Sequence, residues 1–322
     1  MNAGAGSARC VAVAPGATGR HQPSFVAGLQ EEARAMSLVD SSGAPTLADI
    51  IHPTDLTLLS ETAFAHALAL TLACKGRLAI VHAGDPMADQ DPDWTGFPGV
   101  RSLLSRWGLV DRATPRGAIA DALGIRVSKK LVPGSDPVAT LEQFVDEHGC
   151  DLLVLATRAR DGLARLLSGS VAEELTRRTD VPALFLPPEG QGFVDAGTGR
   201  ARLRNLLVPV DHATPQHEAV ETAFGLADLL GCPDALVHLL HVGPADRAPT
   251  VAVAPGQEQR LRRASAEGAV VPGIVATAGR LDADLIVMAT HGHDSFLDGL
   301  RGSTTEQVLR QAGRAVLALP VL

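Results

Sequence analysis

The chain has 322 residues, of which 46% are hydrophobic and 20% are charged, and its formal net charge is −8. This length suits about two folded domains, and the acidic balance gives no electrostatic reason to expect nucleic acid as a partner. No apolar run approaches the roughly 18 residues of a membrane span, the N-terminus lacks a signal-peptide core, and the four cysteines form no CxxC pair. We therefore expect a cytoplasmic protein that neither spans a membrane nor needs disulfides.

The first 45 residues are rich in alanine, glycine and serine, and they include Pro15, Pro23 and Pro45. No long periodic apolar pattern appears in them, so residues 1–45 are expected to form a flexible N-terminal extension. Met36 lies just ahead of the first predicted strand, and the native chain could begin there instead of at Met1.

Residues 46–188 alternate between short apolar runs, typical of buried parallel strands, and stretches with the apolar spacing of helices. Strands are predicted at 47–55, 77–83, 125–132, 150–156 and 181–186, and the main helices at 60–74, 137–148 and 170–179. An insertion at 84–118 carries Trp94 and Trp107, which we interpret as packing anchors and not as a ligand cage. Pro182 predicts that the last strand lies at a sheet edge, because proline cannot donate to a ladder on both sides.

A linker rich in glycine, residues 189–202, leads to a second unit at 203–322. The two units are copies of one another. Residues 151–187 align without a gap on residues 284–320, with 14 identities in 37 positions. An internal repeat this clear predicts the architecture before any local propensity is considered.

Each unit opens with a strand that ends in Pro-x-Asp, IIHPTD at 50–55 and LLVPVD at 206–211. The third strand of the second unit is poorly marked and is expected near 261–265. The alternation predicts an α/β protein with two tandem doubly wound domains, each a five-stranded parallel sheet with helices on both faces. Ligands of such sheets bind beyond the carboxyl ends of the strands, where the strand order reverses, so Pro-x-Asp should lie beside the loop after the fourth strand.

That loop has the chemistry of a phosphate site in the second unit. An apolar strand at 285–289 leads into a loop with Gly292, and a helical pattern begins after Gly302, Ser303 and Thr304. Unsatisfied N–H groups at a helix N-terminus favour anions, glycine permits their close approach, and a hydroxyl can donate to a phosphate oxygen.

At these residues the chain resembles the universal stress protein family, whose signature is glycine, two residues, glycine, nine residues, glycine and a hydroxyl residue. The second unit keeps this spacing, with alanine in the first position, at Ala289, Gly292, Gly302 and Ser303. The first unit keeps it, with alanine in the first two positions, at Ala156, Ala159, Gly169 and Ser170. The resemblance covers residues 47–322 and implies a tandem member with two domains of the adenine nucleotide alpha-hydrolase-like fold.

The resemblance further implies a stress-response protein that binds ATP or a related adenine nucleotide, with no metal beyond Mg accompanying the nucleotide. Carried over to the second unit, the site residues are Pro209, Val210, Asp211, Val242, Ala289, Gly292, Gly302, Ser303 and Thr304. The matching residues of the first unit are Pro53, Thr54, Asp55, Ala83, Ala156, Ala159, Gly169, Ser170 and Val171. We expect the second unit to be the better site, because an alanine methyl blocks close approach and the first unit has more such changes.

Other readings of these residues stay open. Asp55 and Asp211 could simply cap turns, and the Gly-Ser pairs could serve only as helix starts. Arginines around the first unit's loop could attract an anion or be solvated surface charges: they are Arg158, Arg160 and Arg165. Histidines are frequent in the second unit without a tight metal spacing, so no metal site is expected: they are His212, His217, His238, His241, His291 and His293.

No motif indicates a catalytic apparatus, so we do not expect an enzyme, although slow ATP hydrolysis stays open. By the resemblance, the two units should pack as a pseudo-dimer through their last strands, 181–186 and 315–321, which are apolar edges that need covering. The same edges could also bind a second copy of the chain. The alternative function is an interaction or scaffold module of the same fold that binds no nucleotide.

Overall fold

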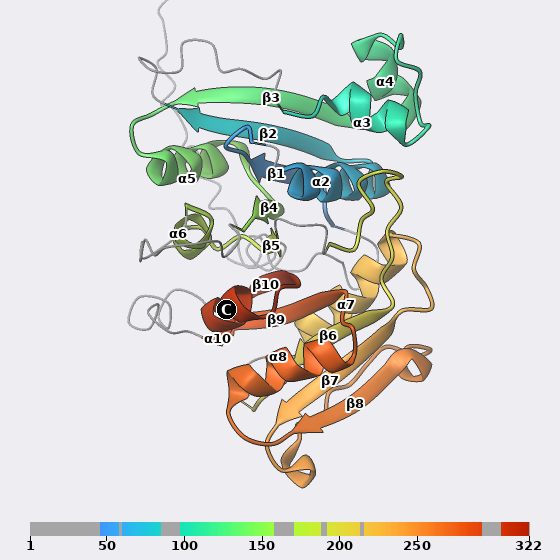
Figure 1. The fold of residues 1–322 in the computed structure, drawn as a ribbon, viewed down its shortest axis with the longest axis vertical. Helices are drawn as coiled ribbons and strands as arrows, with labels where there is room; N and C mark the ends of the chain where they lie inside the picture. The colour runs from blue at the N-terminus through green and yellow to red at the C-terminus, as the bar shows by residue number, and fades with distance from the viewer. Residues whose placement is uncertain are drawn as a thin grey trace, which may run out of the picture.

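A computed structural model describes residues 46–57, 60–84, 97–157, 171–187, 192–212, 216–291 and 304–321. Their strands form one ten-stranded sheet in the order β3-β2-β1-β4-β5-β10-β9-β6-β7-β8 (Figure 1). Every neighbouring pair is parallel except β5 and β10, which are antiparallel. The two repeats therefore each contribute five strands in the order 3-2-1-4-5, and they meet at their last strands. The predicted doubly wound fold and its pseudo-dimeric packing are confirmed.

The first repeat supplies the upper half of the sheet in Figure 1. Its strands are β1 Asp49–Pro53, β2 Arg77–Gly84, β3 Arg126–Pro133, β4 Leu152–Ala156 and β5 Ala183–Leu186. Its helices are α2 Glu61–Cys74, α3 Val100–Arg106, α4 Arg116–Leu123, α5 Pro137–His148 and α6 Val171–Arg178.

The second repeat forms the lower half. Its strands are β6 Asn205–Pro209, β7 Leu236–Val242, β8 Leu261–Ala266, β9 Leu285–His291 and β10 Ala315–Val321. Its helices are α7 His217–Leu229, α8 Val270–Arg280 and α10 Thr304–Gln311, with short 3₁₀ turns at Ala245–Arg247 and Glu258–Arg260. The weakly marked third strand is β8, where the sequence predicted it.

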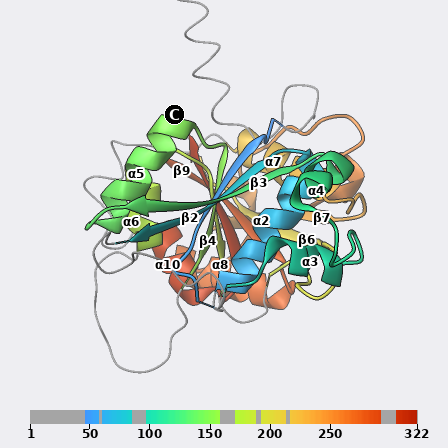
Figure 2. The same ribbon diagram turned by 90° about the horizontal axis from the view of Figure 1, so that it is seen from above.

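Helices cover both faces of the sheet, with α2 and α3 opposite α5 and α6 (Figure 2). One apolar core runs beneath α2 and α7 through both repeats, and Phe64 and Phe224 are fully buried in it. The other face has a separate core in each repeat, and Leu309 of α10 packs against both. The two halves thus share buried surface on both sides of the sheet.

One identity of the repeat, Asp151 and its counterpart Asp284, fixes the strand starts by hydrogen bonds. Asp151 Oδ2 accepts hydrogen bonds from the amides of Ala48 and Asp49, at 2.7 and 2.8 Å. Asp284 Oδ2 does the same in the second repeat, binding the two amides at the start of β6 at 2.7 and 3.0 Å. A carboxylate at the start of the fourth strand therefore fixes the start of the first strand, because charge-assisted bonds to N–H groups are strong.

The prediction from Pro182 is wrong for the assembled sheet, because β5 lies in the interior. Its partner β10 pairs in the register Val316↔Phe185 to Ala318↔Ala183. Pro182 precedes the first paired residue, so no ladder donor is missing there, and its carbonyl still accepts from the Leu153 amide at 2.9 Å. Since each strand covers the other, neither edge is open to a second copy, and the expectation of a homodimer through 181–186 and 315–321 loses its basis.

The described part of the linker is ordered by packing. Phe193 and Val194 are buried, and the Val194 amide donates to Nε2 of the fully buried His66 at 2.9 Å. Trp107 donates from Nε1 to the Ala196 carbonyl at 3.0 Å, as expected of a packing anchor. Gly199 lies under this indole with φ +71°, and a Cβ there would come within 2.3 Å of the ring. Trp94 and residues 1–45 lie outside the described residues.

None of the helices in the described ranges has the length and apolar character that crossing a membrane would require.

We predict that Asp284→Ala lowers the free energy of unfolding by about 1–3 kcal/mol, because two amides lose a charged acceptor. Urea titration would measure this, with Asp246→Ala as the control, since Asp246 is exposed on a short 3₁₀ turn. Equal stability of the two variants would contradict a structural role for the repeated aspartate.

Candidate functional site

The candidate site of the second repeat lies where β6 and β9 separate. The two strands pair only at Leu206↔Leu285 and Leu207↔Ile286. Beyond these pairs β6 stays with β7, and β9 continues beside β10 to its end. This is the point at which the strand order reverses, and it lies at the carboxyl ends of the strands, where doubly wound sheets bind ligands.

Pro209, Val210 and Asp211 follow β6 at this point. The Val210 amide donates to the Leu240 carbonyl at 2.8 Å, and its side chain is buried, so the turn is fixed to β7. Asp211 is exposed, and its Oδ1 accepts from Nε2 of Gln216 at 3.1 Å. Oε1 of Gln216 is buried and has no hydrogen-bond partner in the described part of the chain. The pair offers a carboxylate and a free amide oxygen as hydrogen-bond acceptors.

The end of β7 forms a second wall of the site. His241 lies with Nδ1 3.4 Å from the Val210 carbonyl, and Val242 is the last residue of the strand. Gly273 of α8 allows close packing here, because a Cβ at that position would lie 3.1 Å from the Val242 methyls. The predicted residues after β6 and at the end of β7 are thus neighbours.

The third wall is the end of β9 and the start of α10. Ala289 is half-buried, and the hydroxyl of the next residue, Thr290, donates to the Leu319 carbonyl at 3.1 Å. Thr304 is the exposed first residue of α10. The predicted loop residues Gly292, Gly302 and Ser303 lie outside the described residues, so the structure does not test them.

In the first repeat, the residues that follow β1 form hydrogen bonds with one another. Oδ1 of Asp55 accepts from the amide and hydroxyl of Thr57, at 3.1 and 2.7 Å, and from the Ser60 hydroxyl at 3.1 Å. The buried Thr54 accepts from the amide of Leu56, which has φ +63°. Asp55 therefore caps its own turn, and Ser60 is used in that turn instead of capping α2.

A histidine bridges the point where β1 and β4 separate. His52 is fully buried, and its Nδ1 lies 2.8 Å from the Val154 carbonyl of β4, so Nδ1 carries the proton and donates it. The rings of Phe64 and Phe97 both stack on the imidazole from one side, with centroids 6.2 Å from it and 5.0 Å from each other. In the first repeat, the His52 side chain thus crosses the gap between the first and fourth strands. In the second repeat, the residue at this position is Val208, which cannot form such a hydrogen bond.

The remaining positions of the first repeat are only partly described. Pro53, Ala83 and Ala156 lie at the ends of β1, β2 and β4, and Val171 begins α6. Ala159, Gly169 and Ser170 lie outside the described residues, together with Arg158, Arg160 and Arg165.

Comparison with known proteins decides the family. The model of the universal stress protein family matches residues 48–187 and 252–320, which is more than half of the chain. The chain belongs to the universal stress protein family. A family member of Thermus aquaticus is 31% identical over 129 residues, which are 39% of this chain and 89% of that relative. Another, from Methanocaldococcus jannaschii, is 24% identical over 146 residues, or 42% of this chain and 80% of that relative.

Solved structures agree on the fold. A universal stress protein from Archaeoglobus fulgidus superposes with a TM-score of 0.57 at 18% identity, covering 85% of this chain and 97% of that one. A functionally unknown protein from Pseudomonas aeruginosa gives a TM-score of 0.55 at 17% identity, covering 85% and 93%.

Among the described residues, the histidines of this universal stress protein do not gather into a metal site; His293 lies outside them. Across the described ranges, no group of three or more His, Cys, Asp or Glu side chains could hold an ion. His212 and His241 are neighbours, with ring centroids 6.2 Å apart, but Nε2 of His212 already bonds the Arg247 carbonyl at 2.7 Å. His238 lies at the other end of β7, bonded to Asn205.

Sequence reasoning missed two residues of these sites, His52 and Gln216. The signal for His52 was the difference between IIHPTD and LLVPVD, in which a histidine takes the place of an apolar valine. Gln216 lies five residues after Asp211, as Ser60 lies five after Asp55, and both bond that carboxylate at 3.1 Å. Because glutamine is longer than serine and carries an amide, Gln216 supplies the additional acceptor Oε1.

The buried histidines predict a fall in stability with acid. Burial, partly offset by the Val154 hydrogen bond, lowers the pKa of His52 from 6.5 to about 4, and burial does the same for His66. The unfolded chain takes up these protons near pH 6.5 and the folded chain only near pH 4. The free energy of unfolding should therefore fall between pH 6.5 and 4, by about 3 kcal/mol for each histidine.

Urea titrations at pH 7, 5.5 and 4.5 would measure this loss. His52→Val introduces the residue of the second repeat. It should remove about half of the pH dependence of the free energy of unfolding, whether or not it changes the stability at pH 7. His217→Gln, at a side chain that is 61% exposed, should leave the dependence unchanged. A His52→Val protein with the full pH dependence would show that His52 is not buried in neutral form.

Proposed function

We propose that this universal stress protein binds ATP or a related adenine nucleotide in its second repeat, as a cytoplasmic stress-response protein. The observation that carries the proposal is the arrangement around the separation of β6 and β9. There Asp211, Gln216 and the start of α10 lie at the carboxyl ends of the strands on either side of the reversal point.

Each part has a matching group in a nucleotide. The Asp211 carboxylate can accept from ribose hydroxyls, and the unpartnered Gln216 oxygen can accept from the exocyclic amino group of adenine. The first N–H groups of α10 and the Thr304 hydroxyl suit phosphate oxygens. The base can pack against the half-buried Val242. The predicted glycines of the loop would let the phosphates approach the backbone.

The contrast with the first repeat supports the choice of site. There His52 spans β1 and β4, and the residue five positions after the aspartate is Ser60, whose hydroxyl donates to Asp55. The second repeat has the acceptor Gln216 Oε1 beside its aspartate. The first repeat has the Ser60 hydroxyl there, which donates its proton to Asp55. We propose binding without dedicated catalysis, so that the nucleotide would bias conformation or partners.

Matched aspartate variants test the proposal. Asp211→Ala should weaken ATP binding about 10- to 100-fold, because hydrogen bonds to a charged group contribute about 1.5–3 kcal/mol. Asp55→Ala makes the same change at the equivalent position and should alter affinity less than about threefold. Isothermal titration calorimetry would measure affinity and stoichiometry, and a parallel phosphate-release assay would measure turnover.

Each other outcome has a meaning. If both variants weakened ATP binding equally, the first repeat would contribute to binding as much as the second. A parent protein that ignores ATP would overturn the proposal and favour the interaction module. ATP turnover that Asp211→Ala removes would replace binding with catalysis.

A further inference from the structure

A cavity of about 240 Å³ lies in the first repeat, at the end of the sheet opposite to its Pro-x-Asp turn. It lies between α5 and the amino-terminal parts of β1, β2 and β3. It is partly open to solvent, and its volume exceeds the roughly 150 Å³ of an enclosed cavity that binds benzene, so it has room for a substituted ring. No step of the proposed nucleotide function uses it.

The strand register explains the hollow. Side chains on the α5 face form two rows across the three strands: Asp49, Arg77 and Arg126, then Ile51, Ala79 and Ser128. All six line the cavity. The second row holds two small residues next to each other, on the central and the edge strand, and they leave the space beneath the helix empty.

The second repeat fills the equivalent space. At the register positions of Ala79 and Ser128 it has His238 and Arg262. His238 is buried, and its Nε2 lies 3.1 Å from Oδ1 of Asn205, which itself bonds the Leu281 carbonyl. Burial and the Arg262 charge lower the pKa of this histidine. At the same register position, the second repeat therefore has the imidazole of His238 and the first repeat has the methyl group of Ala79.

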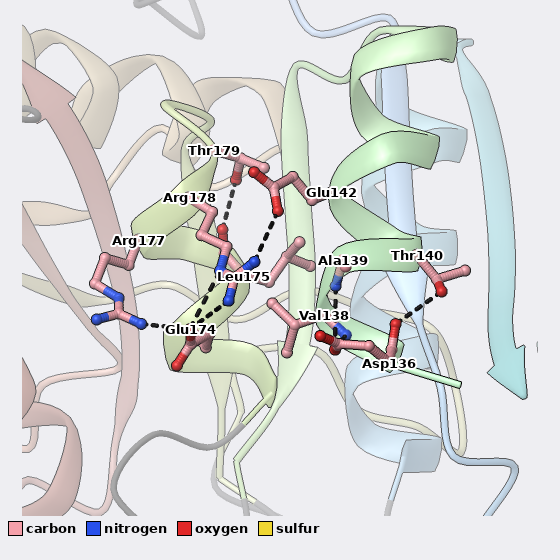
Figure 3. Close-up of polar contacts among 10 residues, drawn as sticks. All are labelled: Asp136, Val138, Ala139, Thr140, Glu142, Glu174, Leu175, Arg177, Arg178 and Thr179. Carbon is pink, nitrogen blue, oxygen red and sulfur yellow. Dashed lines mark hydrogen bonds and ion pairs between the residues drawn. The ribbon is translucent and has the colours of Figure 1, made fainter. Parts of the chain in front are cut away.

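The wall opposite the strands is held in place. Helix α5 is capped by Asp136, whose Oδ1 accepts from the Val138 and Ala139 amides at 3.0 and 3.3 Å (Figure 3). Its Glu142 bonds Arg178 of α6 at 3.1 Å. Near its end Phe144 is buried and stacks on His148, with ring centroids 4.1 Å apart. The cavity thus has a fixed aromatic wall.

The rim is cationic in a protein of net charge −8. Arg77 is neutralised by Asp49, which accepts from its Nε and one terminal nitrogen. Arg126 and Lys130 also line the cavity, and neither forms an ion pair within the described residues. Ile51, Ala79 and Phe144 supply an apolar floor and wall. Two uncompensated cations beside apolar surface suit an anion attached to a hydrophobic body.

We propose that this cavity is a second ligand site, which binds a small carboxylate with a flat apolar body. The ring lies against Phe144 over Ala79, and the carboxylate meets Arg126 and Lys130 with the Ser128 hydroxyl as a further donor. The site is independent of the proposed nucleotide site, because it is formed by α5, β1, β2 and β3 of the first repeat, whereas the nucleotide site lies in the second repeat.

Benzoate is the probe, and benzamide is its neutral isostere. Amide resonances of the full chain would be followed by NMR during titration with each. Benzoate should shift the amides of Ala79, Ser128 and His148 at one molecule per chain, and benzamide should bind at least about tenfold more weakly. Asp211→Ala should leave the benzoate titration unchanged, which separates this site from the nucleotide proposal.

Variants locate the site. Ala79→His copies the second repeat and should abolish the shifts by filling the space. Arg126→Gln with Lys130→Gln changes only exposed side chains and should weaken benzoate about tenfold or more without loss of fold. Arg262→Ala, in the second repeat, is the control and should change nothing.

The proposal fails if benzoate leaves the Ala79 and Ser128 amides unmoved. It fails equally if Ala79→His binds benzoate like the parent, since the probe would then lie elsewhere. Equal affinity for benzamide and benzoate would overturn the assignment of an anionic ligand.

Discussion

The antiparallel pairing of β5 with β10 determines the shape of this protein. Only three residue pairs join the strands, yet they place two apolar edges in the interior of one sheet and merge the cores beneath α2 and α7. Because all other pairs are parallel, the strands of the two repeats run in opposite directions. At the seam, the carboxyl end of β5 therefore lies against the amino-terminal part of β10.

The identities shared by the repeats have two different physical meanings. Asp151 and Asp284 fix the start of the first strand in each repeat, and Thr157 and Thr290 tie the end of the fourth strand to the last. Arg310 of α10 reaches Glu173 of α6 across the seam at 3.5 Å. Such identities preserve the frame and carry no information about ligands. Only the residues after the strand ends bear on function, which is why similarity between repeats does not imply equal sites.

The fold could be predicted from the sequence because its signals are local and repeated. Buried strands of 4–8 residues, helices with one apolar face and a duplicated 37-residue block leave few topologies to consider. The errors came from relations across the chain. Pro182 predicts an edge strand because β5 is the edge of its own half, and only the other half supplies its partner β10. His52 reaches a carbonyl 102 residues away, and the cavity depends on Ala79 and Ser128 becoming neighbours in register. No local pattern shows these.

The two repeats use one frame in complementary ways. The first places a histidine, His52, across the carboxyl-end gap and leaves Ala79 over a cavity at the amino end. The second borders its carboxyl-end gap with Val208 and places His238 at the amino end. A histidine thus occupies a position where the other repeat has an aliphatic side chain, Val208 opposite His52 and Ala79 opposite His238.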